Sequence, residues 1–226
     1  MRAPQHDVTP NRPWPTALVV VTGDDVYEDL FTAVDQLRDL LTAEGFVTRT
    51  AIGTDRLADA GADDLIVLYT AAGRFTVAQR QGLARAVETG AGLLAVHSTA
   101  VLTSPPDQEL FELIGSRYVS HGPPPHESRL RVRLDPDHEL TRGIEPFELT
   151  HEHYRLVTAP DVRVLAWRTT ADGPEPLVHV RAHGRGRVCY LQFGHDRRAW
   201  GEPAVRQLFR RAARWAGRPG PDRGDD

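Results

Sequence analysis

The chain has 226 residues and a formal net charge of −4, with basic and acidic side chains in near balance, so it lacks the electrostatic footprint of a nucleic-acid or membrane-surface binder. It has one cysteine, which excludes an internal disulfide framework. The sequence contains neither a secretory signal nor a long apolar run, so we expect a soluble, cytoplasmic protein.

The first half of the chain alternates short apolar runs with amphipathic segments. β-branched and apolar runs bounded by glycine or polar residues predict strands, and apolar residues at helical spacing predict helices. The predicted strands are 16–23, 46–52, 64–70 and 91–96, and the predicted helices are 27–44 and 76–88. Such alternation is typical of a parallel sheet with right-handed crossovers.

After this half the pattern changes to shorter elements with alternating polarity. A short helix is predicted at 108–114, a proline-rich loop at 120–126, strands at 130–134, 162–168, 176–181 and 187–193, and a closing amphipathic helix at 203–216. The sequence therefore predicts an α/β fold whose mainly parallel sheet carries additional antiparallel strands in its C-terminal half. We expect one domain over 16–217, with disordered tails at 1–15 and 218–226.

His97 is the first candidate for a functional residue. It directly follows the buried run 93–96, and in an open α/β sheet ligands bind outside the carboxyl ends of the strands. The alternative is a histidine at a strand end that only satisfies a hydrogen bond.

The chain has ten histidines, and two of them flank Glu152. If this segment is a strand, His151 and His153 share one face and Glu152 points to the other. Imidazoles and a carboxylate suit zinc, manganese or iron, and they suit proton transfer equally. His6, His126 and His183 are expected to be exposed structural residues, and the role of His179 stays open.

Three other chemistries have weaker support in the sequence. A glutaminase of this fold class needs a cysteine at the turn that His97 occupies, whereas Cys189 lies within an apolar strand. Ser98 lacks the G-x-S-x-G elbow of a serine hydrolase. Gly184 and Gly186 open a strand rather than a helix, so they indicate a hairpin turn and not a phosphate-binding loop.

In their order and spacing, several segments resemble the trehalose-utilisation (ThuA-like) family, which belongs to the class I glutamine amidotransferase-like superfamily. These segments are 88–100 around His97, 114–121 ending in His121, 137–143 around His138, 151–154 with Glu152 and Tyr154, 184–188, and 193–195 ending in His195. The resemblance implies a three-layer sandwich of flavodoxin-like topology. It also implies that five residues share one cleft, namely His97, His121, Glu152, Tyr154 and His195.

The chain departs from the family pattern in three places. His151 stands where the family usually has an aspartate, Glu139 follows His138 where the family has proline, and the first loop carries Tyr27-Glu28 where a histidine is frequent.

The resemblance implies an enzyme that acts on a carbohydrate, a keto-sugar or a glycoside by acid/base chemistry of Glu152 and the histidines, as a lyase, hydrolase or isomerase and not as a glutamine amidotransferase. If a divalent metal assists, zinc is the expected ion, with ligands among His97, His121, His153 and His195. No nucleotide cofactor is expected. The alternative is a non-catalytic sugar-binding or accessory protein whose partner is a sugar oxidoreductase. A homo-oligomer is compatible with either function.

Overall fold

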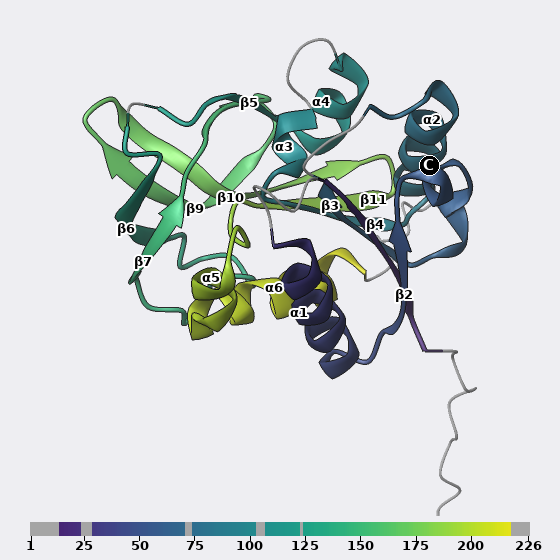
Figure 1. Cartoon of the computed structure of the whole chain (residues 1–226), viewed down its shortest axis with the longest axis horizontal. Coiled ribbons are helices and arrows are strands. Elements are labelled where there is room, and N and C mark those ends of the chain that lie inside the picture. Colours follow the sequence, from purple (N-terminus) through teal and green to yellow (C-terminus); the bar gives the residue numbers. More distant parts are fainter. Residues whose placement is uncertain (1–13, 24–28, 71–73, 103–106, 123, 218–226) are drawn as a thin grey trace, which may run out of the picture.

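A nine-stranded sheet forms the centre of the structure (Figure 1). The structure is a computed structural model, and it describes residues 14–23, 29–70, 74–102, 107–122 and 124–217. Most of both predicted tails, together with His6, Tyr27 and Glu28, lies outside the described residues.

One half of the large sheet is parallel. Its strands are β2 (Val47–Ile52), β1 (Thr16–Thr22), β3 (Leu65–Thr70), β4 (Gly92–Val96) and β11 (Gly186–Leu191), in that spatial order. All of β3 and β4 is buried, as expected for strands covered on both faces. Because β4 and β11 run side by side in the same direction, their carboxyl ends meet at one edge of the sheet.

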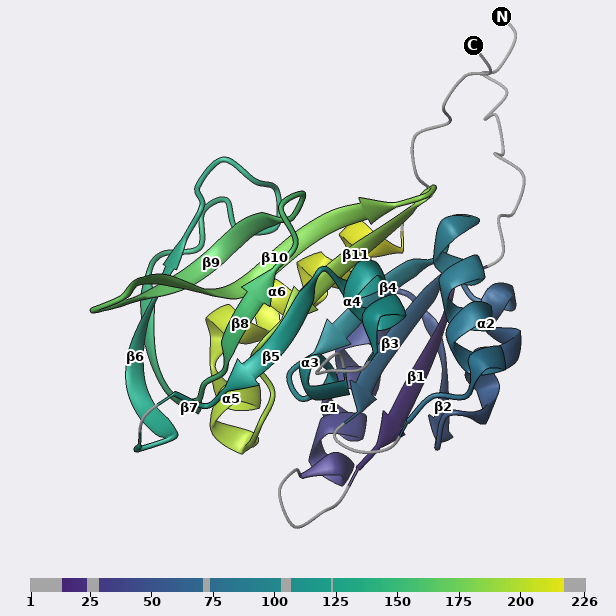
Figure 2. The same ribbon diagram turned by 90° about the horizontal axis from the view of Figure 1, so that it is seen from above.

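The other half is antiparallel and continues from β11 through β10 (Gly173–His183), β9 (Arg163–Thr170), β6 (Glu127–Leu134) and β7 (Phe147–Glu152). The β10–β11 hairpin turns at Gly184, whose φ of 58° lies in the left-handed region. A separate two-stranded sheet pairs β5 (Ser116–Ser120) with β8 (Arg155–Thr158), and it lies on the same side of the large sheet as the short helices that follow β4 (Figures 1 and 2).

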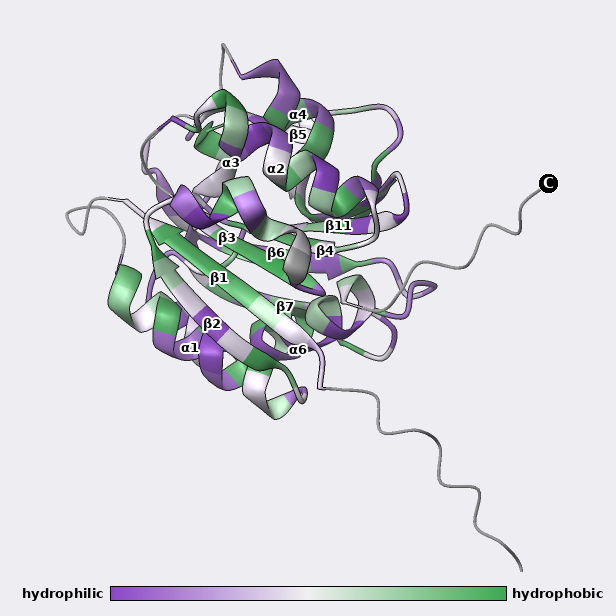
Figure 3. Ribbon diagram, turned by 90° about the vertical axis from the view of Figure 1, so that its right-hand side faces the viewer, coloured by the Kyte–Doolittle hydropathy of each residue, from purple (hydrophilic) through white to green (hydrophobic). Residues whose placement is uncertain are grey.

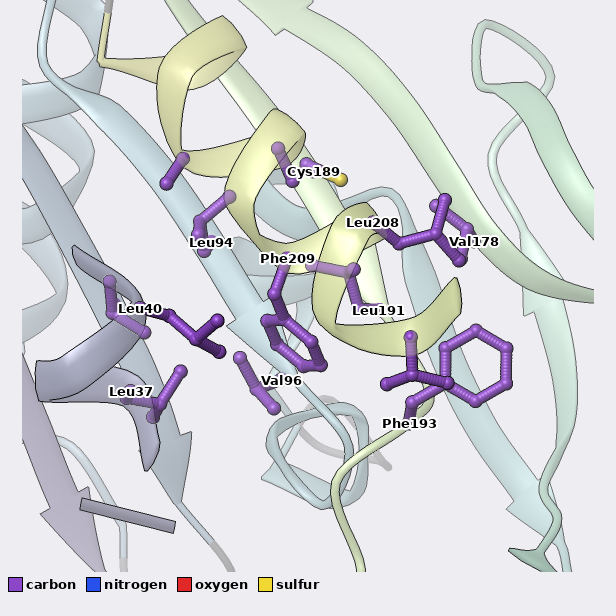
Figure 4. Close-up of a cluster of buried hydrophobic side chains, with 14 of the residues drawn as sticks. Leu37, Leu40, Leu94, Val96, Val178, Cys189, Leu191, Phe193, Leu208 and Phe209 are labelled. Carbon is purple, nitrogen blue, oxygen red and sulfur yellow. The ribbon is translucent and has the colours of Figure 1, made fainter. Parts of the chain in front are cut away.

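Helices cover both faces of the large sheet, which gives three layers (Figure 1). One face carries α1 (Leu30–Ala43), α5 (Arg197–Gly201) and α6 (Pro203–Ala216); the other carries α2 (Val77–Glu88), α3 (Thr99–Leu102), α4 (Gln108–Ile114) and the 3₁₀ segment η1 (Asp55–Ala62). Each layer buries its own core against the sheet. Figure 3 shows the apolar strands between helices of mixed polarity, and Figure 4 shows Leu37, Val96 and Phe209 packed in one of the cores. None of the helices in the described ranges is long and apolar enough to cross a membrane.

The α/β class and the order of the main elements agree with the sequence prediction. The capping residue Thr76 and the closing helix 203–216 are confirmed. The sheet is less parallel than predicted, because the antiparallel half contributes four strands. The sequence prediction missed β5, β7, β8, α3 and α5, which are short or polar and therefore carry little periodic signal. The amidotransferase-like topology stays a resemblance.

Candidate active site

His97 directly follows β4 and has a strained backbone conformation. Its φ of 44° is positive, which no other non-glycine residue in the described ranges adopts. Its backbone is held on both sides: His97 N donates to Leu191 O at 2.7 Å, and its carbonyl accepts from the Tyr190 hydroxyl at 3.0 Å. The side chain is fully buried, so the turn aims the imidazole into the protein rather than into solvent.

The tautomer of His97 follows from its partner. Nδ1 lies 2.7 Å from the backbone oxygen of Gln192, which can only accept, so Nδ1 carries a proton. In the neutral ring Nε2 then bears a lone pair and accepts, whereas in the protonated ring it donates to a neighbouring carboxylate. Nε2 lies 3.1 Å from the Tyr154 hydroxyl and 3.2 Å from Nδ1 of His195, and the Tyr154 ring stacks on the His97 ring with centroids 4.8 Å apart.

Glu152, the last residue of β7, brings a carboxylate to the same point. Oε2 lies 3.1 Å from Nε2 of His97 and 3.4 Å from Nδ1 of His195. Burial alone would raise the pKa of Glu152, but the hydrogen bond with His97 and the nearby imidazole charges outweigh burial and lower this pKa to about 2. Glu152 is therefore ionised at neutral pH.

The second oxygen of Glu152 faces His121, in the loop after β5. Nε2 of His121 lies 3.1 Å from Oε1 of Glu152, and Nδ1 of His121 lies 2.6 Å from the Tyr118 hydroxyl. Burial and the charge of Glu152 raise the pKa of Tyr118, so the phenol stays protonated. Its O–H group donates a hydrogen bond to Nδ1 of His121. His121 then presents Nε2–H to the carboxylate. Tyr118 is not among the site residues predicted from the sequence, and the available signal for it is its position three residues before His121.

His195 follows β11 on a turn built by Gly194. Gly194 has a φ of 120°, and a Cβ atom there would come within 2.9 Å of the Trp200 ring, so only glycine fits. His151 accepts the backbone N–H groups of both Gly194 and His195 through Nε2, each at 3.2 Å. Solvent reaches the side chains of His121, His195 and Glu152, which are 32%, 21% and 17% exposed, but not that of His97.

The remaining histidines have separate locations. His153 follows β7 and is buried, and burial lowers its pKa, but its Nδ1 has no hydrogen-bond partner among the described residues. His126 is exposed, with its ring beside that of His121, and His183 is half-buried at the β10–β11 hairpin. His179 is fully buried and stacks on Tyr190, and neither of its ring nitrogens has a partner in the described part of the chain.

Three ligand-type atoms therefore converge: Nε2 of His97, Nδ1 of His195 and Oε2 of Glu152, separated by 3.1 to 3.4 Å. In the described residues, the group whose ligand atoms all lie within 4.8 Å of one another comprises these three residues and includes neither His121 nor His153. Two lone pairs and a carboxylate repel one another at this spacing unless a proton or a cation lies between them. Tetrahedral zinc with bonds of about 2.0–2.1 Å separates its ligand atoms by about 3.3–3.4 Å, so the donor set and its spacing fit such an ion.

A hollow of about 840 Å³ lies between α1 and α6 and contains none of these residues. Four arginines of α6 line it, but they are engaged in structural contacts. Arg210 and Arg214 both bind Glu44, and Arg211 donates to Arg142 O at 2.7 Å and to Leu140 O at 3.2 Å. These contacts attach α6 to its neighbours, so we do not assign the chemistry to this hollow.

Comparisons with known proteins were consistent with one another. Residues 17–216 match the sequence profile of the ThuA family, described as trehalose utilisation. The fold is similar to that of a ThuA-like protein from Bacteroides uniformis, with a TM-score of 0.73 and 19% identity over 92% of this chain and 94% of the other. A ThuA-like protein from Parabacteroides merdae gives a TM-score of 0.70 and 19% identity over 90% of each chain.

A looser likeness extends to part of a larger protein. A β-galactosidase from Bacillus circulans has a TM-score of 0.62 and 14% identity over 89% of this chain but only 31% of its own. No curated protein sequence matches the chain.

Proposed function

The chain belongs to the ThuA family, described as trehalose utilisation, and from this premise we propose that His97, His121, Glu152, Tyr154 and His195 form the active site of a carbohydrate-directed enzyme. The proposed reaction is acid/base chemistry on a keto-sugar or a glycoside, by elimination, hydrolysis or isomerisation. Each of these reactions needs one group that removes a proton and another that delivers one.

The observation that carries this proposal is the convergence of Nε2 of His97, Nδ1 of His195 and Oε2 of Glu152 at 3.1 to 3.4 Å, with Nδ1 of His97 already donating to Gln192 O. Such an arrangement holds a proton between the imidazoles and the carboxylate. Glu152 is ionised and partly open to solvent, so it is the proposed base. His195, which is also open to solvent and contacts the same carboxylate oxygen as His97, is the proposed acid.

Two contacts support these roles. The Tyr154 ring stacks on the His97 ring, and the Tyr154 hydroxyl contacts Nε2 of His97. Tyr154 therefore fixes the orientation of the imidazole that faces Glu152. His121 presents its N–H to the other carboxylate oxygen, which orients the carboxylate and leaves Oε2 for the reacting proton. The ring positions therefore suit a carboxylate base with imidazoles on both sides.

A divalent metal is a second proposal for the same atoms, and zinc is the expected ion. His97, His195 and Glu152 would hold it. This ligand set differs from the one expected from the sequence, because it contains the Glu152 carboxylate in place of His121 and His153. When bound, such an ion would polarise a sugar oxygen or lower the pKa of a water molecule. The side chains keep the same tasks in either case: Tyr154 fixes His97, and His121 orients Glu152.

The test is a screen of purified, tag-free protein for both turnover and binding. Glycosides and their 3-keto derivatives, trehalose among them, are incubated with the chain, products are followed by chromatography, and binding is followed by calorimetry. Turnover of at least one compound is the expected result. Binding without turnover of any compound would instead support an accessory protein that serves a sugar oxidoreductase.

A further inference from the structure

His151 lies next to the proposed base but turns its ring toward a different strand. It is the fifth residue of β7 and only 1% exposed. Its ring packs edge-on to that of His97, with centroids 5.3 Å apart, and also against Phe193. It donates no ligand atom to the group formed by His97, Glu152 and His195.

The hydrogen bonds of His151 fix its protonation state. Nδ1 contacts the backbone oxygen of Glu152, an acceptor, so Nδ1 carries the proton. Nε2 is 3.2 Å from two backbone N–H groups, those of Gly194 and His195, which can only donate. Both nitrogens of the neutral ring therefore have hydrogen-bond partners: Nδ1–H donates to one backbone oxygen, and Nε2 accepts from two backbone N–H groups.

The segment that receives this ring has left the sheet. Strand β11 ends at Leu191, and the following turn is held from three sides. Tyr69 donates to the carbonyl of Gly194 at 3.0 Å, the Trp200 ring closes on the Cα side of Gly194, and His151 accepts the two N–H groups. His151 is a side-chain acceptor shared by these two amides, and leaving a buried N–H unpaired is costly.

We propose that His151 is a positioning residue: its neutral imidazole fixes the Gly194–His195 backbone and thereby places the His195 ring against Glu152. This inference rests on the proposed function only for what His195 does there. The positioning itself is independent of any reaction, because it concerns two backbone amides and the orientation of one ring.

The test uses three variants of the full chain. His151→Leu removes the acceptor, and His151→Gln keeps an acceptor near the position of Nε2. His179→Leu is a matched control that removes another buried histidine, from β10. Amide hydrogen exchange is measured by NMR at Gly194 and His195, and the ring nitrogens of His195 are followed in histidine-labelled protein. Zinc affinity is measured by calorimetry with the metal alone.

In His151→Leu we expect exchange at the two amides to accelerate about tenfold relative to exchange within β11, and the His195 ring signals to shift. His151→Gln should restore most of the protection, and His179→Leu should leave both readouts as in the wild type. Zinc affinity, where zinc binds, should fall about tenfold or more in His151→Leu alone.

Unchanged exchange and unchanged His195 signals in His151→Leu would overturn the proposal, and so would equal changes in His179→Leu. If the leucine variant does not fold, His151→Gln decides: protection lost despite its acceptor contradicts the proposal. Absence of turnover or of zinc binding in the wild type would count against the proposed function, while the amide readouts would still test the positioning role.

Discussion

Nε2 of His97 lies 3.1 Å from Oε2 of Glu152, although four strands separate β4 from β7 in the order of the sheet. Adjacent strands rotate by roughly 20–25°, so five successive pairings turn β7 by roughly 100° or more relative to β4. This twist, visible in Figure 2, brings the end of the last antiparallel strand over the carboxyl edge of the parallel half. The site therefore depends on the twist of the whole sheet and not on one loop.

Tyr118→Phe tests the orientation of His121. The change removes only the hydroxyl that donates to Nδ1, so the other tautomer of His121 becomes available and its N–H to Glu152 is no longer enforced. We expect turnover to fall about tenfold and the free energy of unfolding by about 1 kcal/mol or less. Ring ¹⁵N NMR of His121 measures the tautomer directly, and a tautomer unchanged by the substitution would show that Tyr118 does not set it.

His179→Leu should make the protein more resistant to acid. Burial lowers the pKa of His179 from 6.5 to about 3, so below pH 6.5 the unfolded chain binds a proton that the folded chain does not. The stability of the wild type therefore falls as pH falls through this window, and the leucine variant lacks that contribution. We expect the variant to gain about 2 kcal/mol relative to the wild type between pH 7 and pH 5. Urea unfolding of both proteins at both pH values measures the free energy of unfolding. An equal change in this free energy between pH 7 and pH 5 in the variant and the wild type would contradict the prediction.

Cys189 should be unreactive in the folded protein. It lies fully buried on β11 among apolar side chains, and burial raises its pKa, so thiolate is scarce at neutral pH (Figure 4). A thiol reagent should label nothing in native protein and one thiol in guanidinium chloride. By the same reasoning we expect no glutaminase activity. Glutamine hydrolysis that Cys189→Ser abolishes would refute this assignment.

Zinc should bind once per chain if the metal proposal holds, with an affinity that falls as the pH falls, because protons compete with the metal for the ligand atoms. His195→Gln should weaken binding about 100-fold or more, whereas His183→Gln, at the distant hairpin, should not change it. Chelator-treated, tag-free protein titrated by calorimetry gives the comparison. Equal affinities in the two variants would place the ion elsewhere.

Local patterns in the sequence predicted the elements with strong periodicity and the residues next to them. The buried run before His97 and the apolar run that ends before His195 identified two strand ends that do meet. Glu152 was recognised through the family resemblance. Five successive strand pairings bring it to His97, and no single segment of the sequence encodes that proximity.

The residues that hold the site's side chains in place were less predictable. His151 looked equivalent to His153 by alternation along a strand, but β7 ends at Glu152, so the alternation stops between them. Tyr118 belongs to a five-residue strand too short for a periodic signal. Tautomers depend on backbone oxygens such as that of Gln192, which every residue carries, so residue types alone cannot indicate them.

If the Glu152 carboxylate performs chemistry on a carbohydrate, kcat/KM should respond to Glu152→Gln and not to Glu148→Gln. Both changes replace a carboxylate by an amide on β7, but Glu148 pairs with Arg129 on the surface, at 2.7 Å, away from the histidines. On the best substrate from the glycoside and 3-keto-glycoside screen, we predict a loss of about 100-fold to 10,000-fold for Glu152→Gln and no change for Glu148→Gln. Turnover by Glu152→Gln at the wild-type rate would contradict the account.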